Sequence, residues 1–230
     1  MFSGQCRKLA LLALIACSSS TQAAIVHLSG TTVDFYYDDA MAGMSTFGTL
    51  SAAGDSIMAT PTDFLASATN TGSDSITATG MVTITAKSGY SFSALQFVQQ
   101  GDYTVFGSGA SVSASGTLTI EDANNSSTFD SSALSVSGLG TVGSTANWNA
   151  DASFDLSSPT WDNVTSIKLS LASLLEASSS TLGEQASIQS KVVGSGMLTI
   201  ETTVVPVPAA VWLFGSGLIA LAGLSRRRRK

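Results

Sequence analysis

The stretch NWNADASFDL, residues 147–156, decides the fold class of this chain of 230 residues. Every second side chain from Trp148 onward is apolar, and the side chains between them are Asn, Asp or Ser. Successive side chains of a β-strand point to opposite faces, so a period of two is typical of a strand with one buried face. An amphipathic helix would instead repeat its apolar residues every three or four positions.

The same alternation recurs on both sides of this stretch, in MVTITAK (81–87), GTLTIE (116–121), SIKLSLAS (166–173) and GMLTIETTVV (196–205). Clusters of Gly, Asn, Asp and Ser separate the runs, and these residue types favour turns; the clusters lie at residues 69–74, 87–90, 121–127 and 137–144. The pattern predicts an all-β domain, an antiparallel β-sandwich of jelly-roll or immunoglobulin-like character. The ambiguous stretch is LASLLEASS (171–179), where a helical turn is the alternative.

The first 23 residues have the three regions of a secretory signal peptide. Arg7 and Lys8 form a basic region, an apolar run covers residues 9–16, and small polar residues follow. We expect a signal helix that is cleaved after Ala23, with cleavage after Ala24 as the near alternative. A second interpretation is a lipoprotein signal, because LIAC (14–17) is similar to a lipobox in which Cys17 carries the lipid. Both signals predict export.

Residues 25–205 are strongly acidic. They contain three lysines, no arginine and all sixteen carboxylates of the chain, which gives a formal charge of −13. A domain with this charge repels phosphate groups, so nucleic acid and anionic lipid surfaces are poor partners. Both cysteines, Cys6 and Cys17, lie in the signal region, so we expect neither disulfides nor thiol chemistry in the exported domain.

The exported domain offers few residues for catalysis. His27 is the only histidine and stands in an apolar, strand-like run, so a surface or edge-strand histidine is favoured over a Ser-His-Asp triad. The neighbouring pairs Asp38/Asp39 and Glu121/Asp122 point to opposite faces of their strands, whereas a glycosidase needs two carboxylates that face each other across a cleft. We therefore predict no enzymatic activity, no metal centre and no cofactor.

Two binding hypotheses stay open at this point. The acidic loops at residues 38–39 and 121–124 carry the hard oxygen ligands that calcium prefers, although solvated loops are the favoured interpretation. Aromatic side chains would bind sugar rings if at least two of Tyr36, Tyr37, Tyr90 and Tyr103 were exposed on one face. Core packing is the favoured role of these tyrosines and of Phe35, Phe92, Phe97 and Phe106.

The C-terminal residues predict a membrane segment. No charged side chain occurs in residues 209–224, and sixteen helical residues span about 24 Å, which is short for a hydrocarbon core. Pro206 and Pro208 cannot lie inside a helix, but Pro208 suits a first turn. The predicted transmembrane helix includes Ala209, Trp212, Phe214, Gly215, Gly217 and Leu224. A basic anchor follows on the cytoplasmic side, made of Arg226, Arg227, Arg228, Arg229 and Lys230.

The tail VPVPAAVWLFGSGLIALAGLSRRRRK (205–230) resembles the PEP-CTERM sorting signal in its V-P-x-P-A-A-x-W-L-F-G-S-G-L variant. The residues that match the sorting motif are Val205, Pro206, Val207 and Pro208, with Val207 in the place where the namesake version carries Glu. The resemblance implies processing by an exosortase, an integral membrane enzyme of Gram-negative bacteria that also make exopolysaccharide. It covers the tail alone and implies nothing directly about residues 25–203.

Three segments are therefore expected: a signal peptide (1–23), an exported acidic β-sandwich domain (24–203) and a C-terminal sorting signal (204–230). The expected function is that of an exported, non-enzymatic protein of the cell surface or exopolysaccharide matrix. Its expected partners are an exosortase-type enzyme, the inner membrane before processing, and exopolysaccharide. The alternative function is a secreted carbohydrate-binding module that uses surface aromatics.

Overall fold

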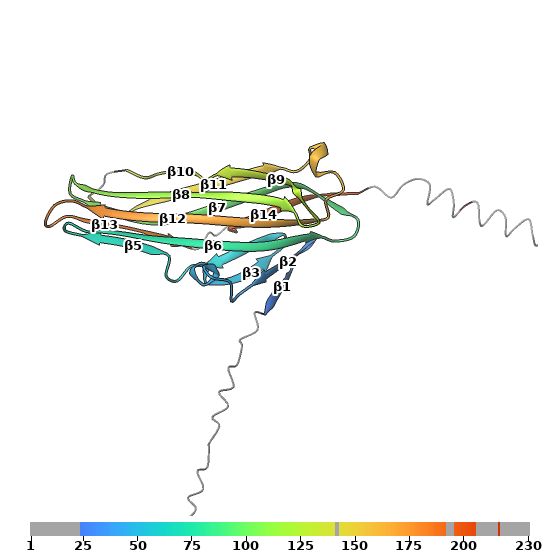
Figure 1. Ribbon diagram of the computed structural model, residues 1–230, viewed down its shortest axis with the longest axis horizontal. Coiled ribbons are helices and arrows are strands. Elements are labelled where there is room, and N and C mark those ends of the chain that lie inside the picture. The colour runs from blue at the N-terminus through green and yellow to red at the C-terminus, as the bar shows by residue number, and fades with distance from the viewer. Residues whose placement is uncertain (1–23, 141–142, 192–195, 206–215, 217–230) are drawn as a thin grey trace, which may run out of the picture.

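The computed structural model describes residues 24–140, 143–191, 196–205 and Ser216, and these residues form two antiparallel β-sheets that lie face to face (Figure 1). Sheet A contains, in spatial order, β1 (Ile25–Ser29), β2 (Val33–Asp38), β6 (Ser73–Ala86), β12 (Ser166–Ser179), β8 (Ala110–Asp122) and β9 (Asn125–Ala133). Sheet B contains, in spatial order, β10 (Ser135–Ser137), β11 (Ala146–Asp155), β7 (Tyr90–Phe106), β14 (Leu198–Val204), β4 (Ser56–Thr60) and β3 (Thr49–Ala53).

Two further strands complete sheet B. β13 (Gln185–Lys191) pairs with the second half of β7, and β5 (Leu65–Thr69) pairs with β13. Two short 3-10 helices, η1 (Met44–Phe47) and η2 (Pro159–Trp161), lie in the connections. The prediction of an all-β antiparallel domain is therefore confirmed, and its two layers resemble a sandwich.

The predicted terminal helices lie almost wholly outside the part of the chain that the structure describes. This applies to the signal peptide (1–23), to the sorting motif beyond Val205, to the transmembrane segment apart from Ser216, and to the basic anchor. Within the described ranges, no helix is both long enough and apolar enough to cross a membrane.

The core fills the space between the sheets and uses the alternating residues of the strands. In β11, Trp148, Ala150, Ala152 and Phe154 are all buried, as the opening stretch predicted. Strand β12 adds Ile167, Leu169, Leu171 and Leu175 from the middle of sheet A, and Phe35, Phe64 and Phe97 are among the most deeply buried side chains. Each large apolar side chain that is fully buried contributes about 1.5–3 kcal/mol.

The alternative of a helical turn at residues 171–179 is wrong. Strand β12 continues to Ser179 and is paired with β6 on one side and β8 on the other over almost its whole length. Leu175 and Ala177 face the core, whereas Leu174 and Glu176 face outward, so the period of two persists. Two neighbouring strands bond the backbone of β12 on both sides, and this tertiary pairing overrides the helix propensity of Leu, Ala and Glu.

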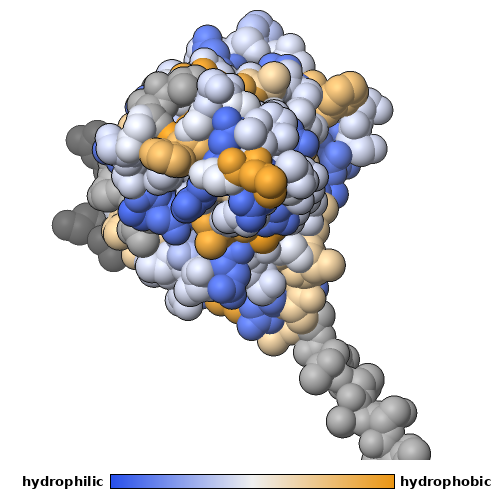
Figure 2. Space-filling model, turned by 90° about the vertical axis from the view of Figure 1, so that its left-hand side faces the viewer, coloured by the Kyte–Doolittle hydropathy of each residue, from blue (hydrophilic) through white to orange (hydrophobic). Residues whose placement is uncertain are grey.

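Three turns meet at one end of the sandwich, where β5 leads to β6, β7 to β8, and β12 to β13. Their backbones are bonded to one another: Asn70 N–H donates to Glu184 O (2.8 Å), and Ser180 N–H donates to Gly109 O (3.1 Å). Figure 2 views this end, where apolar side chains stand among polar ones. Phe106 and Leu182 belong to this region and are 59% and 79% exposed.

Candidate functional site

A row of six side chains crosses the outer face of sheet A, one from each strand. The registers of neighbouring strands align them in pairs. We call them the cross-sheet row: His27, Tyr36, Thr83, Lys168, Glu121 and Phe129. Aligned residues of neighbouring strands are about 4.8 Å apart, so Tyr36 and Phe129, four strands apart, are separated by about 19 Å. An aromatic side chain therefore stands near each end of the row, with polar groups between them.

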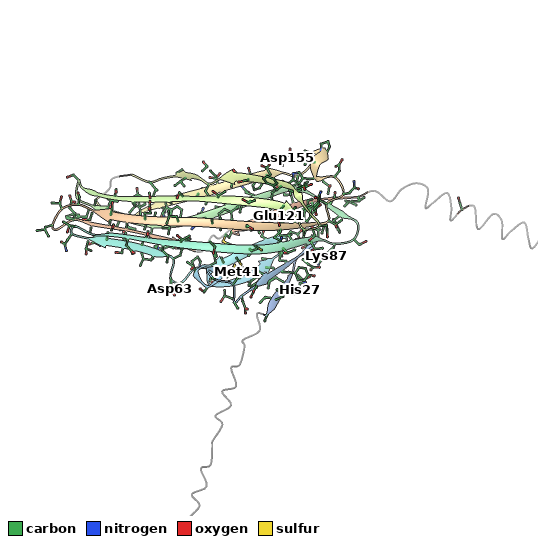
Figure 3. All side chains as sticks on the ribbon, in the orientation of Figure 1. His27, Met41, Asp63, Lys87, Glu121 and Asp155 are labelled. Carbon is green, nitrogen blue, oxygen red and sulfur yellow. The ribbon has the colours of Figure 1, made fainter. Side chains whose placement is uncertain are left out.

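At one end of the row, the carboxylate of Asp34 accepts from several donors. The Ser29 hydroxyl lies 2.8 Å from Asp34 Oδ1, His27 Nε2 lies 3.3 Å from it, and Lys87 Nζ lies 3.5 Å from it. The Ser29 hydrogen bond, aided by His27 and Lys87, holds the pKa of the Asp34 carboxyl below its ordinary value. The His27 ring also stacks on Tyr36, with the ring centroids 4.8 Å apart. Figure 3 shows His27 and Lys87 in the same part of the molecule.

Ser29, His27 and Asp34 are thus neighbours, but their hydrogen bonds do not make a catalytic triad. Ser29 donates directly to the carboxylate. In a triad the serine donates to the imidazole, which then acts as its base. His27 lies on an edge strand, as predicted. There it contacts the side chains of Asp34 and Tyr36 on the surface.

At the other end of the row, Phe129 is 64% exposed on the terminal strand β9. Beside it, Lys168 Nζ and Glu121 Oε1 form an ion pair at 2.5 Å on the partly exposed face. Sequence reasoning missed Phe129. Its signal is a single aromatic residue in the polar run NSSTFDSSA, which contains no other large apolar residue.

The four tyrosines proposed for sugar binding do not share one exposed face. Tyr36 belongs to the cross-sheet row, but its neighbour Tyr37 packs against the core. Tyr103 is 3% exposed, and its hydroxyl donates to Gly138 O (3.0 Å). Tyr90 begins β7 in the other sheet. The predicted core role holds for Phe35, Phe92 and Phe97, whereas Phe106 is exposed.

The acidic loops proposed for calcium are engaged in local hydrogen bonds. Asp38 Oδ1 accepts from Ala40 N–H (2.9 Å), and Asp122 Oδ1 accepts from Asn124 N–H (2.9 Å). Glu121 pairs with Lys168. Among the residues described, no group of three or more His, Cys, Asp or Glu side chains is placed to hold a metal ion.

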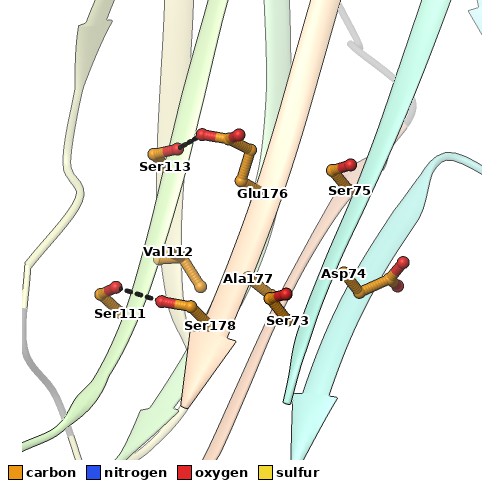
Figure 4. Close-up of a pocket in the computed structure, with 9 residues that line it drawn as sticks. All are labelled: Ser73, Asp74, Ser75, Ser111, Val112, Ser113, Glu176, Ala177 and Ser178. Atoms are coloured by element: carbon orange, nitrogen blue, oxygen red, sulfur yellow. Dashed lines mark hydrogen bonds between the residues drawn. The ribbon is translucent and has the colours of Figure 1, made fainter. Parts of the chain in front are cut away.

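A groove of about 550 Å³ lies across β6, β12 and β8 near the three turns (Figure 4). Its outward side chains are almost all hydroxyls: Ser73, Ser75, Ser111, Ser113 and Ser178, with Glu176 among them. Ser113 donates to Glu176 Oε2 (2.8 Å), and the hydroxyls of Ser111 and Ser178 are 2.8 Å apart. Hydroxyls both donate and accept, so the groove suits hydrated polar molecules.

A second cavity, of about 810 Å³, opens at the opposite end of the sandwich, where β7 begins. We call it the β6–β7 cleft, because residues 86–93 of the connection between these strands form one side; residues 156–157, 161–165, Thr203 and Val205 form the rest. Its wall contains four buried apolar side chains: Phe92, Leu156, Trp161 and Val164. The turn around η2 positions Trp161, whose backbone N–H donates to Ser158 O (2.9 Å).

No family model matches the chain, and neither the curated proteins nor the solved structures include a match. Its function is therefore inferred from its sequence and geometry.

Proposed function

We propose that the chain is an exported, non-enzymatic protein of the cell surface or exopolysaccharide matrix, and that an exosortase-type enzyme processes its C-terminal tail. The observation that carries the proposal is the tail sequence, together with its place in the fold. Strand β14 ends at Val204, and the N–H of Val205 donates to Gly89 O (2.9 Å). Val204 and Val205 are 69% and 46% exposed. The matched motif thus begins where the described sheet ends.

This position suits a processing site. A peptidase takes up its substrate as extended backbone, and prolines such as Pro206 and Pro208 keep a backbone out of helix. The acidic charge and the hydroxyl groups on the outer face of sheet A also suit a hydrated matrix of neutral polysaccharide, because they keep the domain soluble. The inner membrane holds the chain only until the tail is processed.

The test is the intact mass of the protein recovered from the surface or matrix of its native host. We expect a species that begins at Ala24 or Ile25 and ends within residues 205–208. A species that begins at Cys17 with added lipid would identify the lipoprotein signal instead. A species that retains Arg226–Lys230 would contradict processing and make the tail a permanent anchor.

A second candidate function is carbohydrate binding on the cross-sheet row. Its support is the exposed Phe129 in line with Tyr36, because aromatic faces pack against the apolar faces of sugar rings. Phe129→Ala should then lower retention on exopolysaccharide. Phe106→Ala is the matched control, since Phe106 is equally apolar and exposed but lies outside the row. Equal losses in both variants would indicate nonspecific adsorption.

We also propose the jelly-roll over the immunoglobulin-like description of the sandwich. The connections from β5 to β6, β6 to β7 and β7 to β8 each pass from one sheet to the other, and so do those from β11 to β12 and β12 to β13. Such crossing suits a double-sheet jelly roll. A crystal structure with a different strand order would overturn this description.

A further inference from the structure

We propose that the β6–β7 cleft binds a neutral saccharide. This inference stands on the cleft itself and does not rest on the processing of the tail.

The cleft combines an apolar wall with polar groups at its rim. Phe92, Leu156, Trp161 and Val164 supply the wall, and their side chains are fixed by the core. Pockets of several hundred Å³ with apolar walls and a few polar groups are the usual form of a small-molecule site. A pyranose ring has the matching chemistry, since its C–H face is apolar and its edge carries hydroxyls.

The rim groups are available for a ligand. The side chains of Tyr90, Ser93, Asn163 and Thr165 line the cleft and make no hydrogen bond to another group in the described part of the chain. They offer three hydroxyls and one amide, which both donate and accept. The serine groove differs from the cleft, because none of its lining residues is aromatic.

The charges of the cleft select a neutral ligand. Lys87 and Asp162 are its charged lining residues, one of each sign. The surrounding domain carries a formal charge of −13 between residues 25 and 205. An acidic polysaccharide is therefore repelled at long range, while a neutral one is not.

Titration calorimetry on the full chain in detergent tests the site directly, with four probes: cellotetraose, maltotetraose, chitotetraose and an alginate tetramer. We expect binding of at least one neutral tetramer and none of the acidic alginate. Asn163→Gly removes the amide but keeps the left-handed backbone (φ 64°) that glycine adopts freely. It should raise Kd about fivefold, the effect of one net hydrogen bond, and Tyr90→Phe should act in the same direction.

Phe106→Ala is the matched control, because it removes an exposed aromatic at the other end of β7 and leaves the cleft intact. It should leave Kd unchanged. Failure of all four probes to bind would overturn the site, and so would binding that is lost in Phe129→Ala but unaffected by Asn163→Gly and Tyr90→Phe. Neither result bears on the intact-mass test of processing, so the two failures are distinguishable.

Discussion

At the scale of single residues, a glycine makes room for the indole of Trp148. The Trp148 Nε1–H donates to Gln189 O (3.0 Å), and Gly101 on β7 lies between them. A Cβ at Gly101 would stand 1.8 Å from Gln189 O and 2.5 Å from Trp148 Nε1. The missing side chain therefore lets one partly buried hydrogen bond join β11 to β13 across β7.

Gly101→Ala should destabilise the domain. The added methyl meets backbone, which cannot move as a flexible side chain would, so we expect the free energy of unfolding to fall by about 1–3 kcal/mol. Urea denaturation followed by tryptophan fluorescence measures the change. Gly143→Ala is the control, because a Cβ there meets nothing within 4 Å. Equal stability of the two variants would contradict the packing argument.

Asp102 gives the domain a pH dependence. Burial acts to raise the pKa of its carboxyl, but hydrogen bonds from Lys191 and Gln189 outweigh burial and lower the pKa below 3.8. A depressed pKa stabilises the folded state at pH values above 3.8, and this contribution is lost as the pH falls through the lower, folded-state pKa. Asp102→Asn should therefore lower the melting temperature at pH 7 and have a smaller effect near pH 2. An effect that is equal at both pH values would contradict the assignment.

At the scale of elements, strand faces were predictable and the length of β12 was not. Period-two alternation is a local property, so the buried face of β11 could be assigned from Trp148 to Phe154 without knowledge of its neighbours. Residues 171–179 have mixed propensities, and only the pairing with β6 and β8 makes them strand. The core amide of Gln99, bonded to Ser173 Oγ (2.9 Å) across the two sheets, gave no sequence signal either.

The three turns at one end are linked by Glu184, and this link is testable. Glu184 Oε1 accepts from Gly109 N–H (2.8 Å), and its side chain covers the β7–β8 turn. Glu184→Ala should reduce the free energy of unfolding by about 1 kcal/mol and speed hydrogen exchange at Gly109. Glu184→Gln keeps the acceptor oxygen, and it should stay near the parent protein. If the alanine variant exchanged no faster at Gly109, the turn would be held by other contacts.

At the scale of the whole molecule, the negative charge of the β-domain opposes folding. A formal charge of −13 between residues 25 and 205 produces self-repulsion that salt screens. Raising NaCl from 10 mM to 500 mM should increase the melting temperature by about 2–4 °C, the shift that about 1 kcal/mol produces in a domain of this size. Calcium chloride at matched ionic strength should give the same value, and a larger rise would indicate a specific calcium site.

The sequence by itself determined the class of the fold, the buried faces of its main strands and the acidic charge, because alternation, turn residues and composition are local properties. Only the tertiary structure decided which strands are neighbours. It aligned Tyr36 with Thr83 and Thr83 with Lys168, and it closed the β6–β7 cleft from residues 86–93, 156–157, 161–165, Thr203 and Val205. These groups are far apart along the chain, and long-range strand pairing, which no local pattern encodes, brings them together.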